Sequence, residues 1–272
     1  MMVLNQQYID VCNVKIYCEY SINEKPPLFL IHGLASSVYT FNLLIPLLKE
    51  RFTIIAIDLP GFGRSEKSSS FVYSFKNFAK IVLGCIDYFR LKDVNIVGHS
   101  MGGQIALNAA KMSPEKIKNL VLLSSSGYLK RANTILRWCT YLPFFNYFVK
   151  RKVKSKDVRE YLQNVFYKQS FITENYIEEY GKPLKEDGFY VSLTRLLRHR
   201  EGDLSREELK TISLPTLLLW GEEDQVTPVK IGYQLVKDLP NAKLVTFEKT
   251  GHLITEERSN EVYKQILAHA LK

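Results

Sequence analysis

The sequence predicts an α/β protein with a mostly parallel β-sheet and a helical segment inserted into that sheet. Three observations carry this prediction. Short continuous apolar runs such as Leu28–Ile31 and Thr53–Ile57 are typical of parallel strands buried on both faces, and they alternate with stretches of helical apolar spacing. The alternation stops between residues 127 and 213, and it resumes with a strand at Pro215–Trp220. A chain of 272 residues is long enough for one such domain with an inserted subdomain.

The first part of the chain predicts the strands at one side of the sheet. Residues 3–20 alternate between apolar and polar side chains, which indicates antiparallel strands at a sheet edge. The run Leu28–Ile31 predicts a buried parallel strand, and the loop His32–Ser37 follows it. We expect a helix over residues 39–50 before the next strand, Thr53–Ile57.

A glycine-containing loop follows that strand. Its Gly61 and Gly63 resemble part of a dinucleotide-binding loop, but Glu66 occupies the position where the third glycine would be needed. Nucleotide binding through this loop is therefore excluded. We interpret the loop as a structural turn in which Asp58 is not catalytic. Residues 74–91 then predict a helix from their apolar spacing.

The segment Gly98–Gly102, which reads Gly-His-Ser-Met-Gly, joins an apolar strand beginning at Asn95 to a helical run over residues 104–112. This is the G-x-S-x-G pattern of a nucleophile elbow, placed between strand and helix as that pattern requires. The sharp turn would strain the backbone of Ser100, and the flanking glycines would let strand and helix approach closely. We expect the Ser100 hydroxyl to stand above the sheet as a nucleophile.

On these residues the sequence resembles the α/β-hydrolase family, over nearly the whole chain except its middle third. The resemblance implies a mostly parallel eight-stranded sheet flanked by helices, with a helical cap inserted. It divides the chain into a core domain, residues 1–126 and 214–272, and a cap (lid) over residues 127–213, which we refer to as the cap segment. In this family the cap roofs the active site, so substrate specificity is expected there.

The resemblance also implies the groups around the nucleophile. It assigns the oxyanion hole to the backbone N–H groups of Leu34 and Met101. It places the acid of the triad in the loop after the resumed strand, where the pattern G-x-x-D-x-x-x-P selects Asp224. Glu222 and Glu223 are the rival acids, and we expect both to face solvent.

His252 is the candidate base, because it lies in a glycine-containing loop after the last predicted strand, Ala242–Phe247, and downstream of the acid. His32 is a rival, which we interpret as a structural histidine that bonds the backbone of its loop. His199 belongs to the cap segment, and His269 belongs to a closing helix, where we expect it at the surface.

The order Ser100, Asp224, His252 is that of the family's triad. His252 would take the proton of the serine, and Asp224 would fix the tautomer of the imidazole. We therefore expect a serine hydrolase without a metal or organic cofactor. The favoured activity is that of a carboxylesterase, which cleaves small to medium hydrophobic acyl esters through an acyl-enzyme on Ser100. A serine nucleophile excludes the aspartate-dependent dehalogenases and epoxide hydrolases of the same fold.

Other functions share these motifs and stay open. A carbon–carbon bond hydrolase of the ring-cleavage type is the main alternative, since Arg195 or Arg198 could hold a substrate carboxylate. Those enzymes usually carry an aromatic residue after the catalytic histidine, whereas this chain has Leu253. Cofactor-free haloperoxidases and acyltransferases have the same pattern. A low-turnover protein that keeps the triad to sense a ligand is a further alternative.

The formal net charge of the chain is +9, and residues 130–200 hold 15 Lys and Arg against 7 Asp and Glu. No nucleic-acid-binding motif accompanies this excess, so we expect no nucleic-acid partner. The aromatic run Trp138–Val149 precedes the basic run Lys150–Lys156, a combination that could touch acidic lipid. We favour instead aromatic side chains packed inside the cap segment beside a solvated basic helix.

The four cysteines, Cys12, Cys18, Cys85 and Cys139, have neither CxxC nor metal-site spacing. This spacing favours core residues in a reducing compartment. The first ten residues lack a basic start and an apolar run, and no segment approaches the length of a membrane span. We therefore expect a cytoplasmic protein. The sequence predicts no oligomeric state.

Overall fold

The computed structural model describes residues 4–155 and 157–271. Eight strands form one sheet in the order β1-β2-β4-β3-β5-β6-β7-β8. Their bounds are β1 (Asn5–Val11), β2 (Val14–Ser21), β3 (Pro27–Ile31), β4 (Thr53–Ile57), β5 (Val94–His99), β6 (Ile117–Leu123), β7 (Thr216–Gly221) and β8 (Ala242–Phe247). Strand β2 pairs antiparallel with β1 and β4, and all other neighbours pair in parallel. The predicted α/β fold with a mostly parallel eight-stranded sheet is confirmed.

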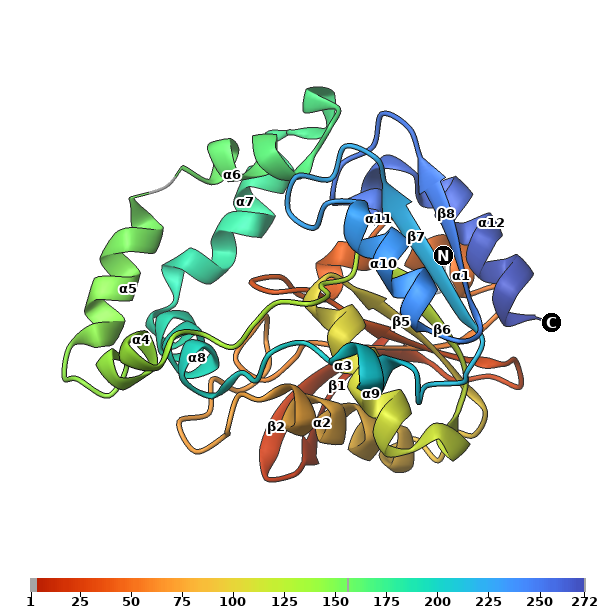
Figure 1. Ribbon diagram of the computed structural model, residues 1–272, viewed down its shortest axis with the longest axis horizontal. Coiled ribbons are helices and arrows are strands. Elements are labelled where there is room, and N and C mark those ends of the chain that lie inside the picture. The colour runs from red at the N-terminus through yellow and green to blue at the C-terminus, as the bar shows by residue number, and fades with distance from the viewer. Residues whose placement is uncertain (1–3, 156, 272) are drawn as a thin grey trace.

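Helices cover both faces of this sheet (Figure 1). Outside the cap segment they are α1 (Ile45–Leu48), α2 (Phe75–Tyr88), α3 (Met101–Met112), α10 (Lys230–Asp238), α11 (Ile254–Glu257) and α12 (Ser259–Ala270). Alternate residues of one strand serve the two faces. Ile55 belongs to the apolar cluster that contains Phe78 of α2, whereas its neighbour Ile54 belongs to the cluster that contains Ile266 of α12. Such burial on both sides explains the continuous apolar runs in the sequence.

Two expectations about helices were wrong in detail. The helix expected over residues 39–50 is a 3₁₀ turn, Val38–Phe41, followed by the short helix α1, which has Pro46 in its first turn. His269 was expected at the surface, but it is buried, with 7% of its area exposed. It lies on the inward face of α12 together with Val262 and Ile266, so helical spacing carries it into the core.

Between β6 and β7, the described residues form helices and no strand. These helices are α4 (Thr134–Cys139), α5 (Phe145–Lys154), α6 (Val158–Val165), α7 (Glu174–Gly181), α8 (Asp187–His199) and α9 (Arg206–Leu209). Most of this segment projects to the left of the sheet in Figure 1, next to the ends of the strands that lead into the site loops. In the part of the chain that the structure describes, no helix has the length and apolarity required to cross a membrane.

Most aromatic residues of the run Trp138–Val149 are exposed rather than packed inside the cap segment, and this corrects the interpretation that we favoured from the sequence. Trp138 is 71% exposed and Phe144 is 81% exposed. Helix α5 packs against α8, and its Val149 and Val153 contact the core, which turns the opposite face of the helix outward. Lys156, the last residue of the basic run, lies outside the described residues.

Candidate active site

Ser100 lies in the turn between β5 and α3 with φ 53° and ψ −119°, a backbone conformation that residues other than glycine rarely adopt. The turn needs its glycines. A Cβ atom at Gly98 would clash with the carbonyl of Gly102, and one at Gly102 would clash with the carbonyl of Ile31. The strained geometry expected of a nucleophile elbow is therefore present at Ser100.

The backbone of Ser100 is tied to the neighbouring strand. Its N–H donates to the carbonyl of Leu123 at the end of β6 over 2.9 Å, and its own carbonyl accepts from the N–H of Ser126 over 3.0 Å. These two hydrogen bonds hold the strained turn in place from one side. The side chain of Ser100 is half-buried, in a region where most neighbours are fully buried.

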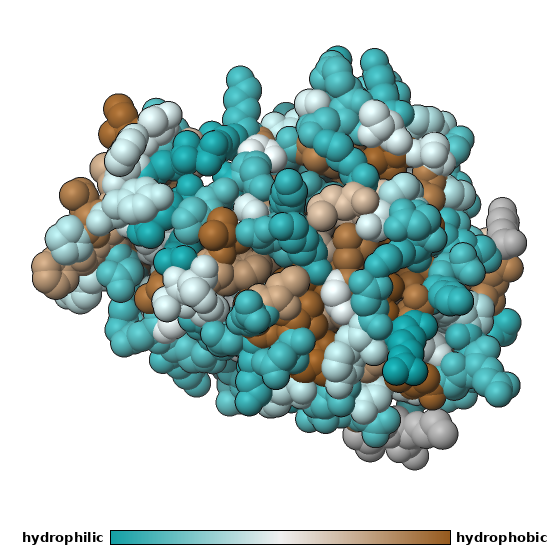
Figure 2. Space-filling model, turned by 90° about the horizontal axis from the view of Figure 1, so that it is seen from below, coloured by the Kyte–Doolittle hydropathy of each residue, from teal (hydrophilic) through white to brown (hydrophobic). Residues whose placement is uncertain are grey.

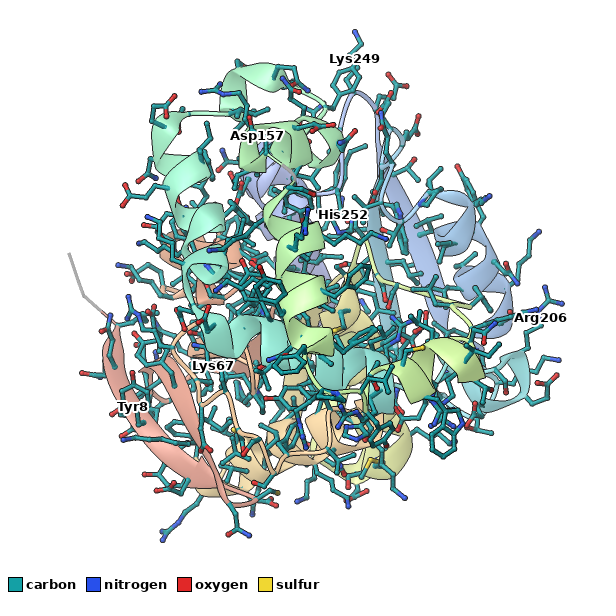
Figure 3. All side chains as sticks on the ribbon, turned by 90° about the vertical axis from the view of Figure 1, so that its left-hand side faces the viewer. Tyr8, Lys67, Asp157, Arg206, Lys249 and His252 are labelled. Carbon is teal, nitrogen blue, oxygen red and sulfur yellow. The ribbon has the colours of Figure 1, made fainter. Side chains whose placement is uncertain are left out.

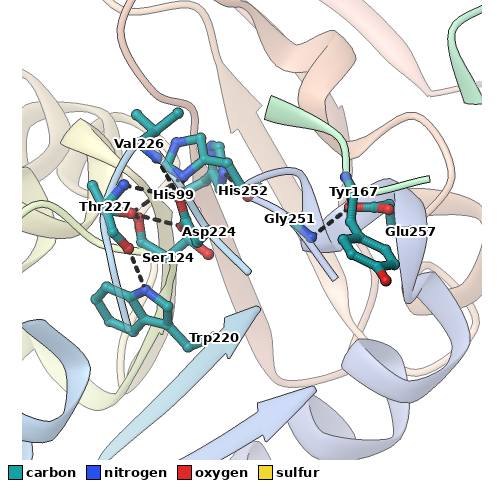
Figure 4. A network of polar contacts seen from close by, with 10 residues as sticks. All are labelled: His99, Ser124, Tyr167, Trp220, Asp224, Val226, Thr227, Gly251, His252 and Glu257. Atoms are coloured by element: carbon teal, nitrogen blue, oxygen red, sulfur yellow. Dashed lines mark hydrogen bonds and ion pairs between the residues drawn. The ribbon is translucent and has the colours of Figure 1, made fainter. Parts of the chain in front are cut away.

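Asp224 and His252 form a hydrogen-bonded pair at the ends of adjacent strands β7 and β8 (Figure 4). Nδ1 of His252 lies 2.8 Å from Oδ2 of Asp224, and both side chains are buried. The other carboxylate oxygen, Oδ1, accepts from the backbone N–H groups of Val226 and Thr227, each over 2.8 Å. Because Asp224 accepts on both oxygens, Nδ1 of His252 carries the hydrogen and Nε2 is left as the basic atom.

The pKa of Asp224 lies below its ordinary value although the group is buried. Burial alone would raise this pKa, but the hydrogen bond and charge of His252 and the donors of Thr227 outweigh that effect. Asp224 is thus an ionised carboxylate that can stabilise a positive charge on His252.

Thr227 completes this pair, and the sequence analysis missed it. Its Oγ1 lies 2.9 Å from Oδ2 of Asp224, 3.2 Å from Nδ1 of His252 and 3.0 Å from the carbonyl oxygen of Ser124. The two oxygens share the single proton that the Thr227 hydroxyl can donate, and the lone pairs of the hydroxyl can accept from Nδ1–H of His252. The spacing Asp224-x-x-Thr227 was visible in the sequence, but it resembles an ordinary turn.

His99 connects His252 to the nucleophile elbow. Its Nε2 donates to the carbonyl oxygen of His252 over 3.0 Å, and the two ring centroids are 4.8 Å apart. Burial lowers the pKa of His99 to about 3, with the nearby His252 contributing in the same direction. His99 is therefore a neutral donor. It immediately precedes Ser100, so this contact links the loop of His252 to the nucleophile elbow.

The loop that carries Leu34 lies directly against Ser100. A Cβ atom built on Gly33 would be 3.0 Å from Cβ of Ser100, and Leu34 follows in the chain. Among the described residues, neither the N–H of Leu34 nor that of Met101 donates a hydrogen bond to the protein. Two backbone donors next to a serine hydroxyl are what an oxyanion hole requires.

The rival residues have other partners. The side chain of His32 donates to the carbonyl of Gly33 over 2.7 Å and accepts from the N–H of Leu59 over 2.9 Å, and burial lowers its pKa to about 4. The role expected for it, a histidine that bonds the loop backbone, is confirmed. Asp58 likewise accepts from backbone N–H groups, those of Val38 and Arg64, over 2.7 Å each.

The two rival acids also have partners of their own. Glu222 accepts from the hydroxyl of Thr246 over 2.7 Å, and Glu223 accepts from the N–H of Thr250 over 2.9 Å. The structure brings together Asp224 and His252, and it pairs neither glutamate with the histidine.

The loop of His252 is also held by the cap segment, which the sequence could not reveal. The N–H of His252 donates to the carbonyl of Val165 over 2.7 Å. The Glu257 carboxylate accepts from the N–H of Gly251 over 2.7 Å and from two N–H groups of the cap segment, Tyr167 over 3.2 Å and Lys168 over 2.8 Å. Figure 4 shows Glu257 between Gly251 and Tyr167, and Figure 3 shows His252 behind the cap helices.

The cap arginines proposed as carboxylate anchors are engaged within the protein. Arg195 donates through Nε and an Nη atom to the carbonyl of Phe71, over 3.4 and 3.1 Å. Arg198 donates to the hydroxyl of Thr140 over 3.0 Å and to the carbonyl of the same residue, and its guanidinium lies 4.0 Å from the ring centre of Tyr141. Arg195 therefore bonds the cap segment to the core, and Arg198 bonds two parts of the cap segment to each other.

A cavity of about 460 Å³ lies next to the loop of Leu34, between the sheet edge and the cap segment. The core contributes the loop residues Ala35 to Tyr39, and the cap segment contributes Tyr180, Lys182 and Phe189. Lys67, labelled in Figure 3, also lines it. The cavity mixes aromatic and charged side chains, and it borders the loop that follows Leu34 rather than Ser100 itself.

Comparisons with known proteins identify the family of the chain. The family model for the alpha/beta hydrolase fold matches residues 26–259. The uncharacterized hydrolase YugF of Bacillus subtilis is 44% identical over 257 residues, which cover 94% of each chain. The pimeloyl-[acyl-carrier protein] methyl ester esterase of Legionella pneumophila is 30% identical over 233 residues, covering 84% of this chain and 87% of the relative.

Among solved structures, the meta-cleavage product hydrolase of Pseudomonas fluorescens IP01 superposes with a TM-score of 0.81. The match covers 98% of this chain and 97% of that one, at 23% sequence identity. At that identity the likeness concerns the fold.

Proposed function

The chain belongs to the α/β-hydrolase family and is a hydrolase, and on that premise we propose that it is a serine hydrolase acting on carboxylic esters. The observation that carries the proposal is the hydrogen bond of 2.8 Å between Asp224 and Nδ1 of His252, held beside the strained turn of Ser100. No other pair of acid and histidine in the described residues lies next to a serine in such a turn.

In the proposed mechanism, Nε2 of His252 removes the proton of the Ser100 hydroxyl as its oxygen attacks the ester carbonyl. Asp224 stabilises the imidazolium that forms. The N–H groups of Leu34 and Met101 donate to the oxyanion, and each such donor is worth about 2.7 to 4 kcal/mol in the transition state. His252 then protonates the leaving alcohol, and water activated by the same histidine releases the acid from Ser100.

We propose small to medium hydrophobic acyl groups as the substrates. An apolar cluster adjoins His252, since the next residue, Leu253, packs with Leu162, Val165, Phe166 and Tyr176 of the cap segment. The esterase name of the relative from Legionella supports ester cleavage. We further propose that residues 127–213 act as the cap of a core formed by residues 1–126 and 214–272, because the cap segment supplies this cluster and bonds the His252 loop.

A cytoplasmic location is part of the proposal. All four cysteines are free. Burial raises the pKa of the Cys85 thiol well above its ordinary value, and the neighbouring Cys18 thiol adds to this effect. Two adjacent buried thiols that remain unpaired suit a reducing compartment.

The test is the initial rate on p-nitrophenyl esters of increasing acyl length, comparing the natural chain with Ser100→Ala. We expect repeated turnover by the natural chain and a near-background rate for the variant. The exposed Ser155 provides a matched control, since Ser155→Ala should keep full activity. Equal activity of Ser100→Ala would refute the proposal.

The carbon–carbon bond hydrolase is the weaker alternative on this structure, because the arginines that it would need are bound to backbone carbonyls. If the chain cleaves no ester but hydrolyses a ring-cleavage product, the carbon–carbon bond hydrolase becomes the favoured function. A ligand sensor would instead release one equivalent of nitrophenol per Ser100 and then stop, which a burst experiment separates from multiple turnover.

A further inference from the structure

The outer surface of α4 and α5 carries an unusual density of exposed apolar side chains. Trp138 is 71% exposed, Phe144 is 81% exposed and Tyr147 is 65% exposed. Eight large apolar residues within positions 135–148 are exposed, namely Ile135, Leu136, Trp138, Tyr141, Leu142, Phe144, Tyr147 and Phe148. We refer to these eight residues as the apolar face. Singly exposed apolar residues are ordinary, but a contiguous group of this kind marks an interaction site.

The apolar face lies at the end of the molecule farthest from the sheet. Helices α4 and α5 form the left-hand end in Figure 1, and Figure 2 shows brown and tan side chains among paler ones at that end. The inner side of α5 is already occupied, since Val149 and Val153 contact the core and Lys150 pairs with Asp187 over 2.6 Å. The apolar face therefore stays exposed to solvent although the cap segment is fully packed on its inner side.

Positive charge continues this surface along α5. Residues 134–155 contain five Lys or Arg and no Asp or Glu. Arg151, Lys152 and Lys154 are exposed, and no ion pair of theirs is found in the described part of the chain. The segment thus has aromatic side chains at one end and unpaired cations at the other.

We propose that the apolar face and the cations of α5 form a docking surface for a lipid bilayer that contains anionic lipids. Trp and Tyr side chains favour the boundary between acyl chains and headgroups, and Lys and Arg next to them bind acidic headgroups. A second copy of this chain fits less well, because a symmetric contact would bring the same unpaired cations together. The proposal does not depend on the chemistry at Ser100.

Trp138 gives a direct readout. The chain has two tryptophans, and Trp220 is fully buried in β7, so a change in emission on adding lipid reports Trp138. With the full chain and vesicles of equal parts phosphatidylglycerol and phosphatidylcholine at low salt, we expect cosedimentation and a shift of emission to shorter wavelength. Pure phosphatidylcholine vesicles, or high salt, should weaken both signals strongly.

Two sets of variants separate the apolar and the charged contributions. Phe144→Ser with Tyr147→Ser keeps Trp138 as reporter and should abolish insertion. Arg151→Glu, Lys152→Glu and Lys154→Glu together should lower vesicle affinity at least about 100-fold, because each cation near an anionic surface strengthens binding about 5-fold. Since all these side chains are exposed, thermal melts should show that the variants fold as the natural chain does.

Matched controls use exposed residues elsewhere. Tyr88→Ser with Tyr233→Ser removes two aromatics that are 53% and 50% exposed, and Lys92→Glu, Lys118→Glu and Lys243→Glu reverse three exposed lysines. Both controls should bind vesicles as the natural chain does. No binding to anionic vesicles at low salt, or equal loss in the controls, would overturn the proposal. A natural chain that is dimeric, with a monomeric Phe144→Ser, Tyr147→Ser variant, would assign the face to a second copy instead.

Discussion

The N–H of His252 donates to the carbonyl of Val165 over 2.7 Å, so the loop of the candidate base is hydrogen-bonded to the end of α6 in the cap segment. The adjacent Gly251 fits tightly there, because a Cβ atom on it would lie 2.5 Å from the same carbonyl oxygen. The position of the base and the position of the cap segment are therefore coupled, and substitutions at their junction should change both.

Glu257 tests this coupling. Its carboxylate accepts from Gly251 and from the cap residues Tyr167 and Lys168. A glutamine keeps only one acceptor oxygen, so its NH2 group would face at least one of these three N–H donors. We expect Glu257→Gln to lower stability by about 2 to 4 kcal/mol, the equivalent of one or two charge-assisted hydrogen bonds. We also expect kcat to fall about 10-fold through misplacement of His252.

The measurements are thermal or urea unfolding and ester kinetics. Glu248→Gln is the matched control, since Glu248 is exposed and lies shortly before the same loop. Unchanged stability and kcat in Glu257→Gln would mean that the three hydrogen bonds do not hold the loop.

Thr227 should act as a positioning residue for the acid and the base. Thr227→Val keeps the shape but removes the hydroxyl that bonds Asp224 and Ser124. We expect the pKa of Asp224 to rise toward its ordinary value, because the Thr227 donors help to lower it. We also expect kcat to fall about 10-fold while KM changes little. Thr227→Ser restores the hydroxyl and should recover most of the rate, and its failure to do so would point to lost packing.

The elbow glycines permit a prediction about folding. Gly102→Ala would drive a methyl group into the backbone carbonyl of Ile31, which cannot move aside as a flexible side chain would. We expect a loss of more than about 3 kcal/mol in the free energy of unfolding. In α7 the Cβ of Gly181→Ala would be 3.6 Å from its nearest neighbour, so this variant should be neutral or stabilised by up to about 1 kcal/mol. Equal melting temperatures for the two variants would contradict the argument.

The fold was predictable because its signals are local. Apolar runs such as Thr53–Ile57 identify strands buried on both faces, and the glycines of the elbow identify a turn at Ser100 from five residues. The roles of Ser100, Asp224 and His252 remain predictions for the kinetics to test, but the positions at strand ends follow from the same local patterns.

The parts that were not predictable depend on contacts between distant segments. Glu257 meets Lys168 across 89 positions of the sequence, and Thr227 meets Ser124 across 103. The outward aromatics of α5 are a similar case. Helical spacing indicates that Tyr147 and Val149 face different ways, but only the packing of α5 on α8 decides which of them meets solvent.

Glu256 predicts how stability depends on pH. Its side chain is 1% exposed and accepts from the hydroxyl of Tyr180 over 2.7 Å. Burial is the main cause that raises its pKa from 4.5 to about 8. The folded protein then keeps a proton that the unfolded chain has lost, so stability falls as the pH rises through this interval and levels off above it.

The effect of Glu256 on stability is best measured between pH 6.5 and 8. The buried His32 and His99 have pKa values lowered to about 4 and 3. They therefore change the stability only below the ordinary histidine pKa of 6.5. Within this pH range we expect urea unfolding to show stability falling by at most about 1.4 kcal/mol per pH unit. Glu256→Gln stays neutral and should remove this slope, whereas the exposed Glu248→Gln should keep it. A slope that survives in Glu256→Gln would show that another group titrates there.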